Sequence, residues 1–354
     1  MDAKRVLADY KKKLDKRLAD FFDQELIRSA RIDKTSRELV ELLKDFTLRG
    51  GKRLRAALLY YGYLCFEKEN PAIIDASMSM ELIQSFLLIH DDIIDKDDTR
   101  RGGPAMHTAY KDYVKKKGIK TDASHLGISL GICAGDMCSA FGNKILANMN
   151  VKPEYRIRAL EKLGKVIRRV VYGQTMDILA NIMEDVSAKD VMKMEELKTA
   201  TYTVEGPLCI GALLAGAKEK DLNLLSDYAI PIGVAYQIQD DILGLYGRED
   251  VLGKPVGSDI KQGKKTPLII IALDRADKKQ EKIIQRNLGK QDLTQKDLED
   301  VRKVVRDTGA LDYCRKNAGD MINTAKKVIA KADFRKQGKD FLIGIADYML
   351  ERKL

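Results

Sequence analysis

Hydrophobic side chains recur at helical spacing along almost the whole chain. An amphipathic helix is predicted over residues 4–30 from apolar residues at helical spacing: Leu7, Leu14, Leu18, Phe21, Phe22 and Leu26. The same periodicity predicts helices at about 36–48, 54–67, 72–95, 104–117, 125–148, 154–183, 189–216, 221–246, 266–286, 294–307, 310–331 and 334–352. Strand-like alternation is scarce. The pattern therefore predicts an all-α protein that forms a single domain over residues 1–354.

Three short segments rich in Gly, Asp or Lys interrupt this pattern: 96–103, 117–124 and 247–265. No internal repeat or low-complexity linker accompanies them. The segment 128–148 is apolar enough to be a central helix. A large helical domain of this kind places its ligand site between facing helices.

The composition fits a protein with a sizeable core and an anionic ligand. Hydrophobic residues make up 45% of the chain, and the net charge of +10 suits a nucleic acid, a membrane surface or a phosphorylated small molecule. The five cysteines form no C-x-x-C pair, which indicates free thiols in a reducing cytoplasm. The chain start resembles neither a signal nor a transit peptide, and no uncharged apolar stretch has membrane-spanning length. We therefore expect a cytoplasmic protein without a transmembrane segment.

A cluster of aspartates ends the apolar segment 78–95, MSMELIQSFLLIHDDIID. Asp91 and Asp95 differ by about 40° around a helix and so share a face. The helix dipole and the like charges one turn apart both disfavour carboxylates there, and a cation relieves both penalties. Magnesium fits, since it commonly takes one or two carboxylates together with phosphate oxygens and water. The alternative is a solvated acidic helix end paired with the basic residues that follow it.

A second apolar segment, 229–244, also ends in paired carboxylates, Asp240 and Asp241. The loop 253–266 that follows is rich in Gly and Lys; it lacks the order of a P-loop but can place lysine charges over an anion. The segment 50–55, GGKRLR, offers another anion pocket at a helix start. This arrangement predicts metal ions that bridge aspartates and a diphosphate, whose negative charge grows as its C–O bond breaks.

These segments resemble the trans-isoprenyl diphosphate synthase family, and most of all an archaeal type I geranylgeranyl diphosphate synthase. The resemblance runs from about residue 50 to 266 on motifs in family order: GGKRLR, DDIID with DTRRG, GQTMD, KTA, and QIQDDILG with GKPVGSDIKQGKK. It implies the isoprenoid synthase fold, a helical bundle around a central substrate cavity, in a homodimer. It also implies a 1′-4 condensation of isopentenyl diphosphate with an allylic diphosphate, using three Mg²⁺ ions.

The resemblance assigns roles residue by residue. It implies that magnesium on the allylic diphosphate is held by Asp91, Asp92 and Asp95 from one side, and by Asp240 with Asp241 beside it from the other. The residues matching the clamp on the allylic diphosphate are Arg100, Lys198, Lys254 and Lys264, and those lining the reacting carbons are Thr199 and Gln237. The pocket for isopentenyl diphosphate matches Lys52, Arg55, Gln84 and Arg101, while Gln174 and Asp177 support the site. The catalytic residues it implies are Asp91, Asp92, Lys198, Thr199, Gln237 and Lys264.

One position departs from the family pattern. Gly244 stands where many relatives carry a third aspartate. Because Asp240 is the main ligand there by similarity, we expect altered detail rather than lost activity. The insert-like stretch 115–126 carries no functional interpretation.

Product length depends by similarity on the residues beneath Asp91. Leu87 and Ile83 share its helical face, and Phe86 lies about 7.5 Å down the axis. An aromatic ring five residues before the first aspartate resembles type I geranylgeranyl diphosphate synthases, which favours a C20 product. The alternatives are a farnesyl or a longer polyprenyl diphosphate, and Phe86 as an ordinary core residue.

Three other functions compete with condensation. A terpene cyclase uses a similar aspartate-rich helix but needs no second diphosphate pocket, which GGKRLR, Gln84 and Arg101 provide. A non-catalytic prenyltransferase subunit is expected to lack aspartates or lysines that this chain retains. A nucleic-acid-binding protein is disfavoured, since no helix-turn-helix signal or basic stripe with interleaved aromatics occurs.

Overall fold

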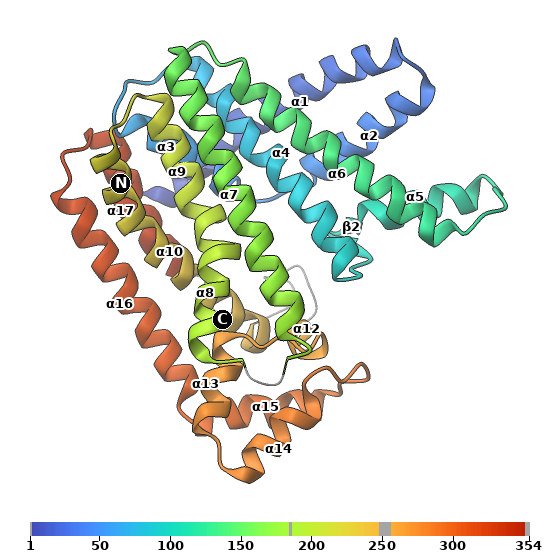
Figure 1. The fold of residues 1–354 in the computed structure, drawn as a ribbon, viewed down its shortest axis with the longest axis vertical. Coiled ribbons are helices and arrows are strands. Elements are labelled where there is room, and N and C mark those ends of the chain that lie inside the picture. The colour runs from blue at the N-terminus through green and yellow to red at the C-terminus, as the bar shows by residue number, and fades with distance from the viewer. Residues whose placement is uncertain (1, 184–185, 248–255, 351–354) are drawn as a thin grey trace. The chain divides into compact units, whose positions relative to one another are not determined.

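The computed structural model describes residues 2–183, 186–247 and 256–350, and helices dominate them (Figure 1). The chain divides into two compact units. The N-terminal unit comprises Asp2–Leu160 with Ile210–Gly216, and the C-terminal unit comprises Glu161–Cys209 with Ala217–Leu354. The predicted all-α class is confirmed, while the single domain over 1–354 stays a prediction.

The first half of the chain forms α1 (Ala3–Ala30), α2 (Lys34–Leu48), α3 (Leu54–Leu64), α4 (Pro71–Ile94), β1 (Thr99–Arg100), β2 (Gly103–Pro104), α5 (Met106–Lys116), α6 (Ala123–Ala147) and α7 (Pro153–Ala180). Aspartate or asparagine side chains cap several of these helices. Asp2, Asp33, Asn70 and Asp122 each accept a backbone N–H of the first turn, which satisfies donors that have no partner inside the helix. The predicted starts of these helices are therefore correct to within two residues.

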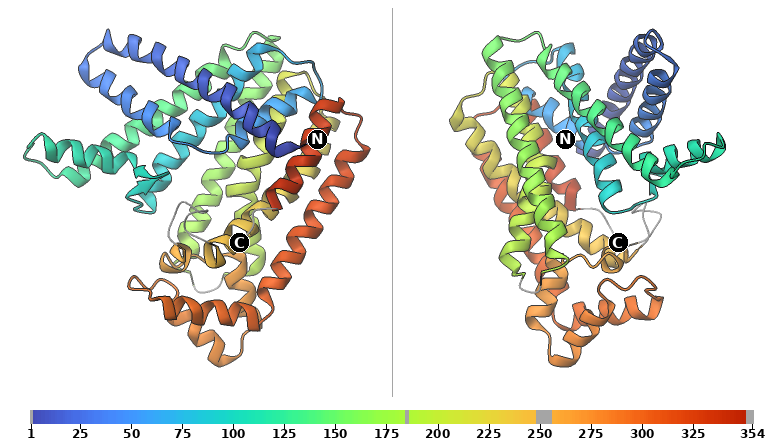
Figure 2. Two further views of the ribbon diagram at one scale, coloured as in Figure 1. Left: turned by 180° about the vertical axis from the view of Figure 1, so that it is seen from behind. Right: turned by 45° about the vertical axis from the view of Figure 1, so that its right-hand side comes forward.

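The second half forms α8 (Ala188–Glu195), the π-helix η1 (Glu196–Glu205), α9 (Gly206–Leu214), α10 (Glu219–Tyr246), α12 (Ser258–Lys261), α13 (Pro267–Arg275), α14 (Lys278–Asn287), α15 (Gln295–Asp307), α16 (Ala310–Lys331) and α17 (Lys336–Leu350). In the C-terminal unit α10 packs against η1, α16 and α17. Figure 2 shows α16 and α17 side by side in both views. The buried Tyr228 hydroxyl donates to the Leu342 carbonyl at 2.7 Å and so joins α10 to α17.

Three local predictions were wrong. The helix predicted over 266–286 is two helices, because Ala276 is extended and the Asp277 side chain caps a new helix, α14. The helix predicted over 189–216 contains the π-helix η1, where the Thr201 hydroxyl donates to the carbonyl of Glu196, five residues earlier, at 2.9 Å. The segment 96–103, predicted to be irregular, contributes to the antiparallel hairpin β1–β2.

Helix α4 is the core helix of the N-terminal unit and packs on α6 (Figure 1). It is the only helix in the described ranges that is long and apolar enough to cross a membrane. However, 67% of its most apolar window is buried inside the protein. Its residues Leu82 and Ile89 belong to a buried core cluster together with Phe22 of α1 and Phe141 of α6. This burial assigns α4 to the protein core.

Candidate active site

The first aspartate cluster lies at the C-terminal end of α4, as predicted. Asp91 and Asp92 occupy its last turn, and Asp95 is the residue that ends it. The Asp92 side chain is completely buried, and Nε of Arg100 donates to its Oδ1 at 2.6 Å. Burial nevertheless outweighs this ion pair and raises the pKa of Asp92 to about 6. The end of α4 therefore holds a carboxyl group whose charge, among the residues that the structure describes, is offset by Arg100 alone.

The hairpin β1–β2 brings Arg100 and Arg101 to this place. Its two-residue turn is Arg101-Gly102, and both residues have positive φ, 52° and 74°. A two-residue turn in which both residues have positive φ matches the twist of a hairpin, although this backbone conformation is strained for an arginine. Arg101 donates from Nη1 to the carbonyl of Gly50 at 3.3 Å. The hairpin thus joins the aspartate cluster to the segment GGKRLR.

Positive charge accumulates where the hairpin meets this segment. Burial lowers the pKa of Arg101, and the positive charges of Arg53, Arg55 and Arg100 lower it further, against the opposing effect of Glu81. Gln84 lies one turn beyond Glu81 on α4 and is buried, whereas Lys52 is exposed in the loop. Such a concentration of guanidinium groups favours an anion with several oxygens. The structure thus brings Arg55 and Arg101, two of the four predicted pocket residues, close to each other.

Arg53 has a different environment from its basic neighbours. Its side chain is completely buried, its backbone has φ 57°, and it donates to Asp15 at 2.7 Å and Glu81 at 2.9 Å. A third bond, at 2.9 Å, reaches the Thr47 carbonyl. Arg53 therefore fixes the junction between the loop that carries Lys52 and the first turn of α3, which carries Arg55. Sequence reasoning did not single it out.

The three predicted chain-length residues differ in their surroundings. Ile83 is completely buried against α6, where a side chain on Gly142 would come within 2.9 Å of it. Phe86 is partly buried, and the His90 ring meets it edge-on at 4.9 Å. Leu87 is also partly buried. The Phe86 ring is thus held from one side by another ring.

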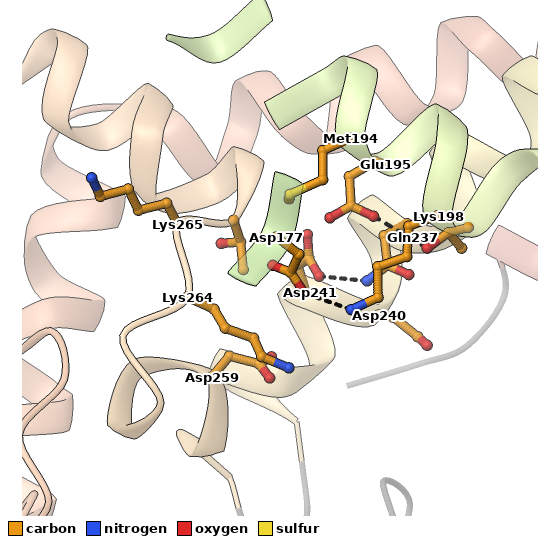
Figure 3. A pocket seen from close by; sticks show the side chains of 12 residues that line it. Asp177, Met194, Glu195, Lys198, Gln237, Asp240, Asp241, Asp259, Lys264 and Lys265 are labelled. Atoms are coloured by element: carbon orange, nitrogen blue, oxygen red, sulfur yellow. Dashed lines mark hydrogen bonds and ion pairs between the residues drawn. The ribbon is translucent and has the colours of Figure 1, made fainter. Parts of the chain in front are cut away.

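A cavity of about 170 Å³ lies within the C-terminal unit (Figure 3). Its lining residues come from α7, α8, η1, α10, α12 and the loop before α13: Asp177, Met194, Glu195, Lys198, Thr199, Gln237, Asp240, Asp241, Asp259, Lys264, Lys265 and Thr266. The structure thus brings together seven residues named in the sequence analysis: Asp177, Lys198, Thr199, Gln237, Asp240, Asp241 and Lys264. Lys254, another predicted clamp residue, lies outside the described residues.

Negative charge dominates this cavity. Five carboxylates line it against three lysines, a formal excess of two negative charges. Lys198 donates to Asp177 at 2.5 Å, whereas Lys265 points away from the carboxylates (Figure 3). Burial raises the pKa of Asp241 well above its usual range, and the charges of Glu195 and Asp259 add to this effect. A cavity with this charge binds an anion only together with additional cations.

Asp259 occupies the place that Gly244 leaves open. A Cβ atom at Gly244 would lie 2.8 Å from Oδ2 of Asp259. The amide of Gly257 also donates to the Gly244 carbonyl at 2.9 Å, which holds α12 against α10. Asp259 therefore stands where the third aspartate of the family pattern would project. The sequence contains the signal, since Asp259 is part of the motif GSDIKQGKK, but the motif alone does not show this proximity.

The carboxylates fit a metal ion that arrives with its ligand. Within residues 2–183, 186–247 and 256–350, no three His, Cys, Asp or Glu side chains form a ready-made metal site. Oδ2 of Asp92 and Oδ2 of Asp241 are buried, and neither has a hydrogen-bond partner in the described structure. Such oxygens are costly to bury and are relieved by a cation. Magnesium suits them, since it takes one or two carboxylates and completes its shell with phosphate oxygens and water.

The sequence of this chain is similar to those of known proteins. Residues 36–306 match the family model described as polyprenyl synthetase. The chain is 32% identical to a geranylgeranyl pyrophosphate synthase from Geoglobus acetivorans over 89% of this chain and 91% of that protein. It is also 32% identical to a geranylfarnesyl diphosphate synthase from Aeropyrum pernix, over 90% of this chain and 95% of the relative.

A solved structure shares the fold. It is a geranylgeranyl pyrophosphate synthase from Corynebacterium glutamicum, complexed with isoprenyl diphosphate and magnesium. The TM-score is 0.92 at 30% identity, covering 98% of this chain and 99% of the other. The predicted isoprenoid synthase fold is therefore confirmed.

Proposed function

Because the chain belongs to the polyprenyl synthetase family and is a prenyltransferase, we propose that it condenses isopentenyl diphosphate with an allylic diphosphate to a trans-prenyl diphosphate of C20 length. The observation that carries this proposal is the pair of neighbouring anion-binding features in the N-terminal unit. The carboxylates at the end of α4 suit a metal-bound diphosphate, and the arginines around Arg101 suit a second diphosphate without metal. A condensation needs both substrates, whereas a cyclase needs one.

The proposed roles follow the chemistry of each side chain. Asp91, Asp92 and Asp95 bind Mg²⁺ in the N-terminal unit, and Asp240, Asp241 and Asp259 bind it in the C-terminal unit, with three ions in total. Mg²⁺ neutralises the diphosphate as the C–O bond breaks and so lowers the barrier to its departure. Arg100, Lys198 and Lys264 hold the remaining oxygens.

The neutral polar residues serve the reacting carbons. Gln237 donates from Nε2 to Oδ1 of Asp241 at 2.8 Å, which leaves its carbonyl oxygen available to face positive charge on the allylic carbon. Gln84, Arg55, Lys52 and Arg101 hold isopentenyl diphosphate, whose double bond attacks that carbon. Transfer of a proton from the resulting cation to the departed diphosphate then forms the trans double bond. The protein itself accelerates the condensation mainly by positioning the two substrates and by excluding water from the site.

The direct test is incubation with isopentenyl diphosphate, Mg²⁺ and allylic diphosphates of increasing length, followed by chromatography of the products. We expect one diphosphate released per isopentenyl unit added, and a C20 main product. Release of diphosphate without elongation would instead identify a cyclase.

Removal of the metal is expected to stop this reaction. With EDTA in excess, the carboxylates of the acidic cavity repel the diphosphate, so turnover should fall to background and return when Mg²⁺ is added back. The measurement is the initial rate against free Mg²⁺ at constant ionic strength. Full activity in EDTA would contradict the metal roles of both aspartate clusters.

Product length tests the role of Phe86. Phe86→Ala removes the ring that His90 holds in place, so the tail should extend further and the main product should become longer than C20. Phe86→Tyr keeps the ring and should keep the product. An unchanged C20 profile in Phe86→Ala would mean that another residue limits the tail.

We also propose that the protein acts in the cytoplasm as a homodimer. Ile128 and Ile132 support a subunit interface, since they are 36% and 43% exposed on one face of α6. Light scattering of the purified protein measures its molar mass in solution and so tests whether it is a dimer.

A further inference from the structure

Glu195 is a buried acid that the roles proposed so far do not use. It ends α8, it is only 6% exposed, and its carboxylate lines the cavity beside Lys198 and Asp241 (Figure 3). Among the described residues, no Lys or Arg forms an ion pair with it, because Lys198 pairs with Asp177 instead. Burial raises the pKa of Glu195 to about 7. An apolar side chain of this size would be cheaper to bury here, so stability alone does not explain the acid.

The one hydrogen bond of the Glu195 side chain in the described structure connects it to the proposed chemistry. The Thr199 hydroxyl donates to Oε2 of Glu195 at 3.2 Å. A threonine hydroxyl has one proton, so this bond leaves only lone pairs to face the cavity. Gln237, which also lines the cavity, likewise donates an N–H to Asp241 and retains its carbonyl oxygen. Both neutral residues are thus oriented by a carboxylate so that an oxygen faces the ligand.

We infer that Glu195 is a positioning residue for the condensation, acting through Thr199. This inference rests on the proposed function, in which positive charge develops on the allylic carbon. Glu195 accepts a hydrogen bond from the Thr199 hydroxyl and so directs the lone pairs of the hydroxyl oxygen toward that charge. An oxygen lone pair oriented in advance stabilises the transition state more than one that must reorient during the reaction.

The test compares Glu195→Met, which removes the acceptor, with Glu195→Gln, which retains an acceptor oxygen. We expect kcat to fall about 10- to 100-fold in Glu195→Met and less in Glu195→Gln, with the KM for the allylic substrate changed less than about threefold. Thermal stability should be unchanged or higher in Glu195→Met, since a buried acid is removed. A purely structural role for Glu195 predicts the opposite: lower stability and unchanged kcat.

Thr199 provides the decisive comparison. If Glu195 acts through Thr199, the double variant Glu195→Met/Thr199→Val should be no slower than the slower single variant, within about twofold. Thr199→Ser retains the hydroxyl and should retain most of kcat. Glu196→Met is the matched control, because Glu196 pairs with Lys193 and Arg169 and does not line the cavity.

Three results would overturn the inference. They are wild-type kcat in Glu195→Met, losses in the double variant that multiply, and full recovery of Glu195→Met at high Mg²⁺, which would make Glu195 a metal ligand. A wild-type protein that fails to condense the two substrates would instead refute the proposed function.

Discussion

Replacing Asp91 with alanine is expected to lower turnover by about 10³-fold or more. Asp91 lies in the last turn of α4, next to the buried pair of Asp92 and Arg100. Without its carboxylate, the proposed metal–diphosphate complex loses a ligand at the stage where charge builds on the leaving group, and such a loss amounts to several kcal/mol. The measurement is kcat with saturating isopentenyl and allylic diphosphates.

The matched control for this experiment is Asp112→Ala. Asp112 is exposed on α5 and lies outside both candidate sites. It should retain wild-type kcat, and both variants should have the same helix content by circular dichroism. An Asp91→Ala enzyme within about tenfold of the wild type would refute a metal role for Asp91.

Replacing Arg53 with methionine is expected to reduce the free energy of unfolding by about 3–5 kcal/mol. The methionine fills a similar volume but leaves Glu81, which is only 4% exposed, without the guanidinium that neutralises it. A buried carboxylate that loses its ion-pair partner is costly, and Asp15 and the Thr47 carbonyl each lose one donor, although Lys11 still donates to Asp15. Urea denaturation followed by circular dichroism measures the change.

Arg17→Met is the control for this second experiment. Arg17 also binds an aspartate through two bonds, at 2.7 and 2.6 Å to Asp75, but its side chain is 49% exposed. Water screens such a pair, so the expected loss is below about 1 kcal/mol. Equal losses in the two variants would show that burial of the Arg53 pairs adds nothing to stability.

The helices could be predicted from the sequence because each buries one face, and this burial makes apolar residues recur every three or four positions along the chain. Seven residues that line the acidic cavity were also predicted: the charge pattern indicated Asp240 and Asp241, and the family resemblance implied the other five. Arg53 was not recognised, since its partners Asp15 and Glu81 are 38 and 28 residues away and nothing local shows that it is buried. Glu195 was missed for a related reason. A charged residue in the polar stretch 193–198 is usually solvated, and only the path of η1 reveals that this one faces a cavity.

The pairs formed by Arg100 with Asp92 and by Lys198 with Asp177 also bear on the release of product. These two of the proposed clamp residues each have a carboxylate partner within the protein. Binding therefore exchanges one counter-ion for another, and the affinity gained is only the difference between the two interactions. When the diphosphate leaves, the internal pairs form again and offset part of the cost of separating such strongly charged groups. The internal ion pairs thus lower the affinity of the enzyme for its diphosphate ligands. We expect this lower affinity to make dissociation of the diphosphate fast enough for repeated turnover.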